Sequence, residues 1–422
     1  MNRSAAMDWI SSRAGRHPAL AVFLVSALVF GVFNVLPVLR EAGHIAEHGQ
    51  VHTHVRLAAE MLQGRVEFHE AFYKDIAEFH GRFYSPFPPF PAFFLIPLVA
   101  VFGVNLPTML LTPLLGALAG TALFRLLRTL GIRTDTAAWA TAGFLFGTVF
   151  WLVVRFSFDT YFAHVLATVL VFLALEAAAA HRSGAWIGLA MGAAFLTRQL
   201  TVLALPFAWL LMLRPGEPLL SRRFLKAVLA SVPALALALG IYLYYNWIRF
   251  GNPLDCGYAY IPEYSWYLTR LDKWGVQSLA YVPSNFVRLF LQGFVIEFND
   301  PDLMIPDISR AGTSLTFASP FLFFAFRNRF RDRPLLDWTA WGGIGLCALA
   351  VMMNKNAMGG WQINGMRYAL DFLPVLAVLA ARGMQRDADT PWRRAWQGAI
   401  AYSIGLNLLA TALYYLPKLL SA

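Results

Sequence analysis

The chain has 422 residues, of which 58% are hydrophobic and only 14% are charged, and its mean hydropathy is +0.54. This composition excludes an ordinary soluble domain and is typical of an integral membrane protein. The net charge of +10 fits arginines that lie between membrane spans and meet anionic headgroups, so we expect membrane lipids and no nucleic acid as partners.

The N-terminal segment carries Arg3, Arg13 and Arg16 ahead of an apolar run over residues 18–38. No small-residue cleavage site follows this run. The pattern therefore predicts an uncleaved first span rather than a signal peptide.

Further apolar segments close to the length of a membrane crossing recur along the whole chain. The predicted spans are 18–38, 107–124, 137–154, 161–180, 184–197, 199–213, 225–246, 312–327, 337–353, 366–381 and 396–417. We therefore expect one all-α polytopic domain over residues 1–422 with about eleven transmembrane helices.

The segment 89–103 is apolar and rich in proline but only about 15 residues long, which favours a re-entrant or juxtamembrane half-helix. If this segment does not cross and the N-terminus is cytoplasmic, the basic clusters between spans all fall on the cytoplasmic side. These clusters are Arg125, Arg128 and Arg133; Arg182; Arg214, Arg222, Arg223 and Lys226; Arg327, Arg329, Arg331 and Arg333; and Arg382, Arg386, Arg393 and Arg394. We predict this orientation, in a plasma (inner) membrane, with large extracytoplasmic loops at 39–88 and 247–311.

The first outer loop contains VRLAAEMLQGR at 55–65, whose apolar residues have helical spacing and predict an amphipathic helix at the membrane interface. His44, His48 and His52 are four residues apart, so on one helix they share a face; His48 and His52 are our candidate ligands of a divalent metal ion. The alternative is that they are interfacial polar residues.

Asp75 precedes the proline-rich motif HGRFYSPFPPFPA at 80–92. A carboxylate here is a candidate general base, although most loop carboxylates are only solvated. Arg82 and Tyr84 belong to the motif, and we expect them beside a lipid substrate at headgroup depth.

Charges also occur at the predicted outer ends of spans, where they are costly and therefore functional by default. RFSFD carries Arg155 and Asp159, and LTRQL carries Arg198. Arg155 and Asp159 are four residues apart, so a purely structural ion pair is the alternative.

GGWQINGMRYALDFLP carries Arg367 and Asp371 at the same spacing, with Lys355 upstream. Cations at one depth can bind a lipid phosphate, or can be anchors and ion pairs. The second outer loop opens with RFGNPLDCGY and continues through an aromatic stretch at 276–296 that predicts an interfacial helix broken by Pro283.

These motifs together resemble the GT-C superfamily of polytopic glycosyltransferases. The resemblance is to the group of protein O-mannosyltransferases and of the enzyme that adds aminoarabinose to lipid A, and most of all to bacterial relatives of undefined substrate. It covers almost the whole chain through LAAEMLQGR, DIAEFHGRFYSPFPPFPA, RFSFD, LTRQ, YYNWIRFGNPLDCGY, GTSLTFASPFL and GGWQINGMRYALDFLP.

The resemblance implies a polyprenyl-phosphate sugar donor, an extracytoplasmic active site, and inverting transfer assisted by a carboxylate of the first outer loop. It implies that Asp159 corresponds to a second acidic position that the superfamily has after a span. It also implies that Arg198 and Arg367 bind the lipid phosphate. We group Arg155, Lys355 and Asp371 with them as candidate substrate contacts.

One position departs from the family pattern, because the usual acidic residue after the first span is Gln50 here. The base must then be one of Glu47, Glu60, Asp75, His52 or His54, unless activity is lost. A transporter or flippase of lipid-linked saccharide, and a polymerase or ligase of surface polysaccharide, stay as alternatives, although we find no internal inverted repeat of the kind that many transporters have.

Overall fold

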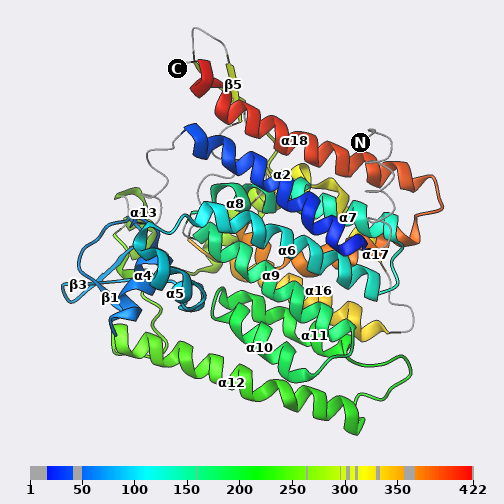
Figure 1. Ribbon diagram of the computed structural model, residues 1–422, viewed down its shortest axis with the longest axis horizontal. Coiled ribbons are helices and arrows are strands. Elements are labelled where there is room, and N and C mark those ends of the chain that lie inside the picture. The colour runs from blue at the N-terminus through cyan, green and yellow to red at the C-terminus, as the bar shows by residue number, and fades with distance from the viewer. Residues whose placement is uncertain are drawn as a thin grey trace, which may run out of the picture.

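The computed structural model describes residues 17–40, 50–158, 160–262, 265–294, 296–300, 305–308, 312–328, 333–355 and 366–420. Its fold is predominantly helical, and most of the long helices run roughly side by side (Figure 1). In order of the chain, the main helices are α2 (Pro18–Arg40), α4 (Thr53–Leu62), α5 (Phe90–Phe102), α6 (Thr108–Thr129), α7 (Thr134–Gly147), α8 (Phe150–Phe156), α9 (Thr160–Ala179), α10 (Gly184–Phe195), α11 (Leu205–Leu211), α12 (Arg222–Phe250), α16 (Pro334–Met352), α17 (Leu373–Arg386) and α18 (Trp392–Leu420).

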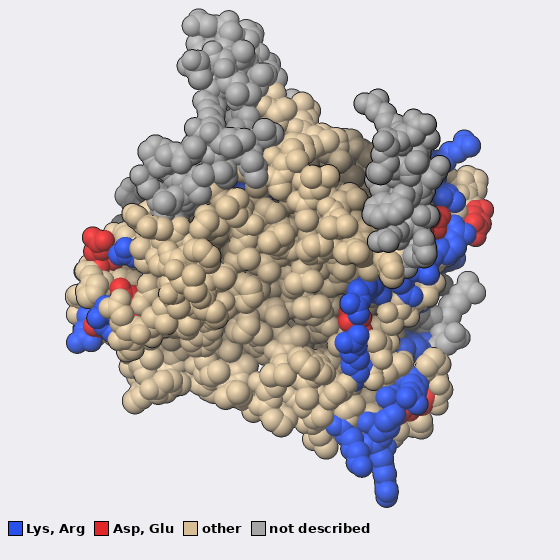
Figure 2. Space-filling model, viewed as in Figure 1, with Lys and Arg blue, Asp and Glu red and all other residues tan. Residues whose placement is uncertain are grey.

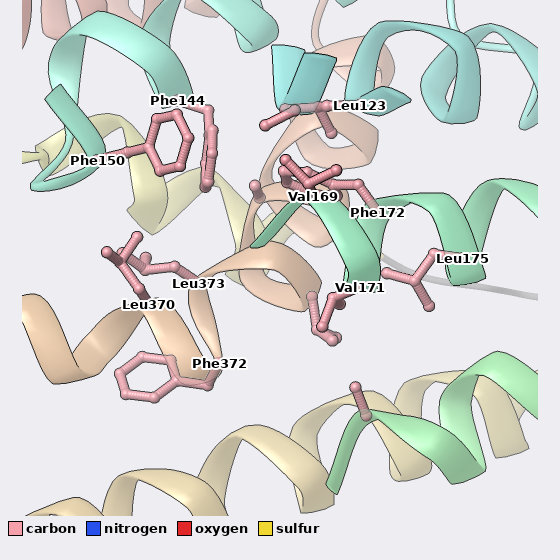
Figure 3. Packing of buried hydrophobic residues seen from close by; sticks show 14 of the residues in the cluster. Leu123, Phe144, Phe150, Val169, Val171, Phe172, Leu175, Leu370, Phe372 and Leu373 are labelled. Atoms are coloured by element: carbon pink, nitrogen blue, oxygen red, sulfur yellow. The ribbon is translucent and has the colours of Figure 1, made fainter. Parts of the chain in front are cut away.

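The core is centred on α9, a helix without charged residues on its first turns and with most of its length buried inside the protein. It packs against α6 on one side and α10 on the other, while α2 covers α6 and α12 covers α10 (Figure 1). Aromatic side chains from neighbouring helices meet here: the rings of Phe144 and Phe172 lie edge to face with centroids 5.0 Å apart (Figure 3). Such pairs add to the stabilisation that apolar burial provides.

The contact between α10 and α12 depends on a row of glycines at four-residue spacing. A Cβ atom added at Gly184 would lie 1.7 Å from the carbonyl oxygen of Ala227, and one at Gly188 would lie 2.3 Å from that of Ser231. Four-residue spacing puts these glycines on one helix face, so the two backbones approach closely, as is common between membrane helices.

Within the described residues, four helices are long and apolar enough to cross a membrane, or up to five if the bent pair α7 and α8 is one span. The predicted number of about eleven spans is therefore not confirmed. Several predicted spans are instead broken: 199–213 consists of the 3-10 helix η2 (Gln199–Ala204) and α11, and 312–327 of α15 (Leu315–Ala318) and the 3-10 helix η6 (Pro320–Arg327). Pro206 and Pro320 stand at the starts of α11 and η6, where the rigid ring begins a new helix but cannot continue an old one.

The proline-rich segment forms α5 and the short 3-10 helix η1 (Gly103–Asn105). With 13 residues, α5 is about 20 Å long, shorter than the hydrocarbon core of a bilayer. It packs against α4, away from the middle of the bundle (Figure 1). The N–H group of Phe90 donates a hydrogen bond to the carbonyl oxygen of Leu196 (3.0 Å), and Gln50 Nε2 donates one to Asn105 Oδ1 (3.1 Å).

Two small sheets were not part of the all-α prediction. Strands β1 (Glu67–Phe68), β2 (Ala77–Phe79) and β3 (Arg82–Tyr84) form an antiparallel sheet in the order β1-β3-β2, with Ala77 opposite Tyr84. His80 and Gly81 both have positive φ, 51° and 74°, as a tight two-residue hairpin turn requires. Strands β4 (Ile296–Asp300) and β5 (Ile305–Ile308) form the second sheet. Strands this short have too few residues for an alternating pattern to stand out in the sequence.

The second outer loop is largely helical. It contains η3 (Tyr258–Tyr260) and α13 (Ser265–Trp274), followed by three consecutive short helices, η4 (Leu279–Tyr281), α14 (Val282–Phe286) and the π-helix η5 (Val287–Leu291). The sequence predicted an interfacial helix over 276–296, and these three short helices occupy its central part, with Pro283 in the first turn of α14.

Exposed basic side chains gather at one end of the bundle (Figure 2). We call this group the arginine band; its exposed members are Arg125, Arg128, Arg182, Arg214, Arg222, Lys226, Arg386 and Arg394. The helices α6 and α9 end at the band, whereas α10 and α12 begin there. The starts of α6 and α9 and the ends of α10 and α12 therefore lie at the opposite end, with α4, α5 and the first sheet (Figure 1).

Candidate functional site

A cavity of about 1200 Å³ lies at the bundle end opposite the arginine band. Its wall combines the loop 71–76, the first turns of α9, the segment after α10, the loop 252–262, the end of α16 and the 3-10 helix η7 (Arg367–Asp371). The charged residues that line the cavity are Lys74, Asp75, Arg198, Asp255, Lys355, Arg367 and Asp371. Five of these were selected from the sequence, and they come from segments far apart in the chain.

Arg198 and Asp371 form a bidentate ion pair in the wall. Arg198 Nε donates to Oδ1 at 2.5 Å and Nη2 donates to Oδ2 at 2.8 Å, while the side chains are 18% and 1% exposed. Arg198 lies between α10 and η2 and has an extended backbone. This conformation separates the two helices and lets the side chain reach Asp371 of η7. A buried pair with this fork geometry fixes both partners in place.

The spacing of four residues between Arg367 and Asp371 had predicted that these two side chains meet each other. In an α-helix residues four apart share a face, but η7 is a 3-10 helix with three residues per turn. Arg367 and Asp371 therefore point about 120° apart, and Asp371 meets Arg198 from the segment after α10 rather than a cation from its own helix.

Arg367 lies among aromatic rings beside this pair. Its guanidinium carbon is 4.8 Å from the ring centroid of Tyr161 and 5.0 Å from that of Tyr368, and the guanidinium carbon of Arg198 is 5.3 Å from the same Tyr368 ring. Cation–π contacts hold the two arginines close to each other although their charges repel. With Lys355, which lines the same cavity, they form what we call the cationic pole.

Asp75 is half-buried in the loop that joins β1 to β2. The next residue, Ile76, is only 1% exposed and belongs to the hydrophobic core, and the ring of Tyr73 packs edge to face on that of Phe158. These two contacts hold the loop against the core and the segment before α9, and keep Asp75 at the cavity wall.

The loop 252–262 supplies polar groups that sequence reasoning did not select. Asp255 accepts hydrogen bonds from the N–H group of Gly257 (2.8 Å) and from the hydroxyl of Tyr260 (2.6 Å). Burial raises the pKa of Tyr258, so its hydroxyl stays protonated in the wall. Lys74 was also missed. Asp255 and Tyr258 lie within RFGNPLDCGY, and Lys74 directly precedes Asp75, but no spacing in these stretches singled them out.

Arg249 fixes the end of α12 to the segment before α5. Although the residue is only 3% exposed, it donates hydrogen bonds to Asn246 Oδ1 (2.7 Å), to the carbonyl oxygen of Tyr245 (3.0 Å) and to that of Ser85. The adjacent Phe250 packs on Tyr84, with ring centroids 5.6 Å apart. Arg249 thus links α12 to the start of the PFPPFP segment.

Several candidates from the sequence do not line the cavity. Glu60 accepts two hydrogen bonds from Arg65 (2.9 and 2.7 Å), Arg82 is exposed and donates to Glu67 (3.0 Å), and Arg155 donates to Thr411 of α18 (2.7 Å). Tyr84 is buried beneath Phe250, and His52 is buried beside the rings of Phe158 and Phe162. Glu47, His48 and Asp159 lie outside the described residues.

The described part of the chain contains no group of three or more His, Cys, Asp or Glu side chains that could hold a metal ion. Because His48 is outside this part, metal binding stays a prediction.

Comparison with protein-family models gave no match, and neither did comparison with curated proteins. Among solved structures, the chain is similar to ArnT from Cupriavidus metallidurans, whose structure was determined with undecaprenyl phosphate bound. The two sequences are 18% identical and the TM-score is 0.47. The similarity covers 96% of this chain but 65% of ArnT, so the chain spans less than two thirds of that protein's length.

Proposed function

We propose that this protein is a membrane glycosyltransferase that moves a sugar from a polyprenyl-phosphate donor to an acceptor outside the cytoplasm, with inversion. The observation that supports this most strongly is the cavity in which the half-buried carboxylate of Asp75 accompanies the cationic pole of Arg198, Arg367 and Lys355. The motif resemblance described above names the same class of reaction.

The cationic pole suits the phosphate of such a donor. When the bond between the anomeric carbon and the phosphate oxygen breaks, its electron pair stays on the phosphate, whose negative charge then increases. Preorganised cations in a site shielded from water stabilise this charge more than water would. Arginine also matches phosphate oxygens with paired N–H donors.

Asp75 is the proposed general base. The acceptor oxygen attacks the anomeric carbon from the face opposite the phosphate, and its proton passes to Asp75 as the new bond forms. A single displacement of this kind inverts the anomeric configuration. Protonation of Asp371 would break its ion pair with Arg198, and protonation of Asp255 would weaken the two hydrogen bonds that it accepts, so neither is proposed as the base.

The proposed orientation has the arginine band in the cytoplasm and the cavity on the opposite side, because basic residues are retained on the cytoplasmic face. Leu225, Leu229 and Leu237 on α12 are exposed and provide apolar surface for lipid chains.

The test is transfer of label from radiolabelled polyprenyl-phosphate mannose, glucose, galactose and aminoarabinose to the acceptors of a cell-envelope extract, catalysed by the purified protein in lipid nanodiscs. Wild type should consume at least one donor, and Asp75→Asn should lower the rate by about 10²–10⁴-fold because the proton acceptor is lost. Glu78→Gln is the matched control, since Glu78 is an exposed carboxylate on β2, and it should keep the wild-type rate. No donor consumption by wild type would exclude the proposed function, and an unchanged rate in Asp75→Asn would exclude Asp75 as the base.

A further inference from the structure

His54 is a buried imidazole in the wall of the cavity. It stands in the first turn of α4, is 0% exposed and lines the cavity. Its ring lies beside that of Phe87, with centroids 5.8 Å apart, and beside that of His52, at 5.7 Å. The apolar and aromatic neighbours fix the ring without using its polar atoms.

Neither ring nitrogen of His54 has a hydrogen-bond partner among the described residues. Leaving a buried polar group without a partner costs free energy, and such groups in folded proteins call for an explanation. By contrast, Arg198, Asp371 and Asp255 in the same wall all have partners. A group that reached the ring from the cavity would therefore satisfy a nitrogen that otherwise has no hydrogen-bond partner among the described residues.

The protonation state limits what that group can be. Burial lowers the pKa of His54 to about 3, so the ring is neutral and is a weak base at physiological pH. A neutral imidazole has one N–H donor and one nitrogen acceptor. A hydroxyl group, which also donates and accepts, fits this pair of atoms, whereas a phosphate offers only acceptors.

We propose that His54 binds a hydroxyl group of the sugar carried by the lipid donor, an inference that rests on the proposed function. The donor's sugar is favoured over the acceptor because the His54 ring packs beside that of Phe87. Phe87 and Pro88 line the same cavity and lead into the apolar helix α5, so we expect a lipid-linked sugar to enter on this side.

The experiment compares His54→Phe with wild type in nanodiscs, using plain undecaprenyl phosphate and undecaprenyl-phosphate mannose, glucose and galactose as probes. For each protein, the affinity for each sugar lipid is divided by the affinity for undecaprenyl phosphate. We expect wild type to bind at least one sugar lipid more tightly than the plain lipid. In His54→Phe this preference should fall by about three- to tenfold, the effect of one neutral hydrogen bond.

The same variant should raise the apparent Tm without any ligand, because phenylalanine keeps the ring but has no unpaired nitrogens. A residue with a purely structural role would lower it. His69→Phe is the control: His69 is exposed, has Arg65 Nη2 3.1 Å from Nε2, and should change neither quantity.

The outcomes separate the two proposals. If wild type binds none of the four lipids, the proposed function fails. If wild type binds undecaprenyl phosphate but prefers no sugar lipid, or if His54→Phe keeps the full preference, the assignment of His54 fails while the lipid-phosphate site stands.

Discussion

The chemistry proposed for the cavity depends on single buried side chains. The sequence identified several of these residues, but it did not identify the residues that they contact. Arg198 and Asp371 were both selected from charge at a predicted membrane boundary, yet their contact joins positions 173 residues apart. Local spacing paired Asp371 with Arg367 because it assumed an α-helix. A contact between distant segments depends on how helices pack, which no local pattern contains.

At this scale His54 also makes stability depend on pH. Its pKa is about 3 in the folded protein, whereas a solvent-exposed histidine has a pKa of 6.5, so between these values the unfolded chain binds a proton that the folded protein does not. The free energy of unfolding therefore falls as pH is lowered through this window, by about 1.4 kcal/mol per pH unit from this group.

Thermal unfolding of the detergent-purified protein at pH 7, 6 and 5 measures this effect. His54→Phe lacks the titrating ring, so wild type should lose more stability than the variant as pH falls, while other groups contribute equally to both. Parallel curves for the two proteins would contradict the low pKa.

At the scale of elements, the contact between α10 and α12 should be highly sensitive to a single substitution. Gly188→Ala puts a Cβ atom 2.3 Å from a backbone oxygen and 2.8 Å from a backbone carbon of Ser231, and backbone atoms cannot move aside cheaply. We expect a loss of about 1–3 kcal/mol or more, seen as a lower apparent Tm.

Gly240→Ala is the matched control, because Gly240 lies inside α12 and has nothing within 4 Å of an added Cβ atom. It should stabilise slightly, since alanine loses less backbone entropy than glycine in a helix. Equal Tm values for the two variants would show that the close approach of α10 and α12 does not matter for stability.

The elements that the sequence predicted well have strong local signals. The apolar stripe at 55–65 became α4 (Thr53–Leu62), and the proline-rich run at 89–103 became α5 (Phe90–Phe102). The β2–β3 hairpin was missed because three-residue strands show no clear alternation.

The proposed orientation puts the two ends of the bundle on opposite sides of the membrane, and cysteine labelling can test this. In a background with Cys256→Ser and Cys347→Ala, Arg82→Cys should react with a membrane-impermeant maleimide added to intact cells. Arg214→Cys, at the exposed start of the α11–α12 loop, should react only after the cells are opened. The reverse pattern would invert the proposed orientation and move the cavity to the cytoplasmic side.

The shortness of α5 has a consequence for how this protein is made. With 13 residues, α5 lacks about seven residues of a full crossing, so in the proposed orientation the chain crosses outward in α2 and returns in α6. A small apolar insertion in α5 would give it spanning length and require every later helix to insert in the opposite direction. The basic clusters after α6 would then have to be translocated during synthesis, against their preference for the cytoplasm. In the proposed orientation, the basic clusters and the short length of α5 therefore favour the same topology.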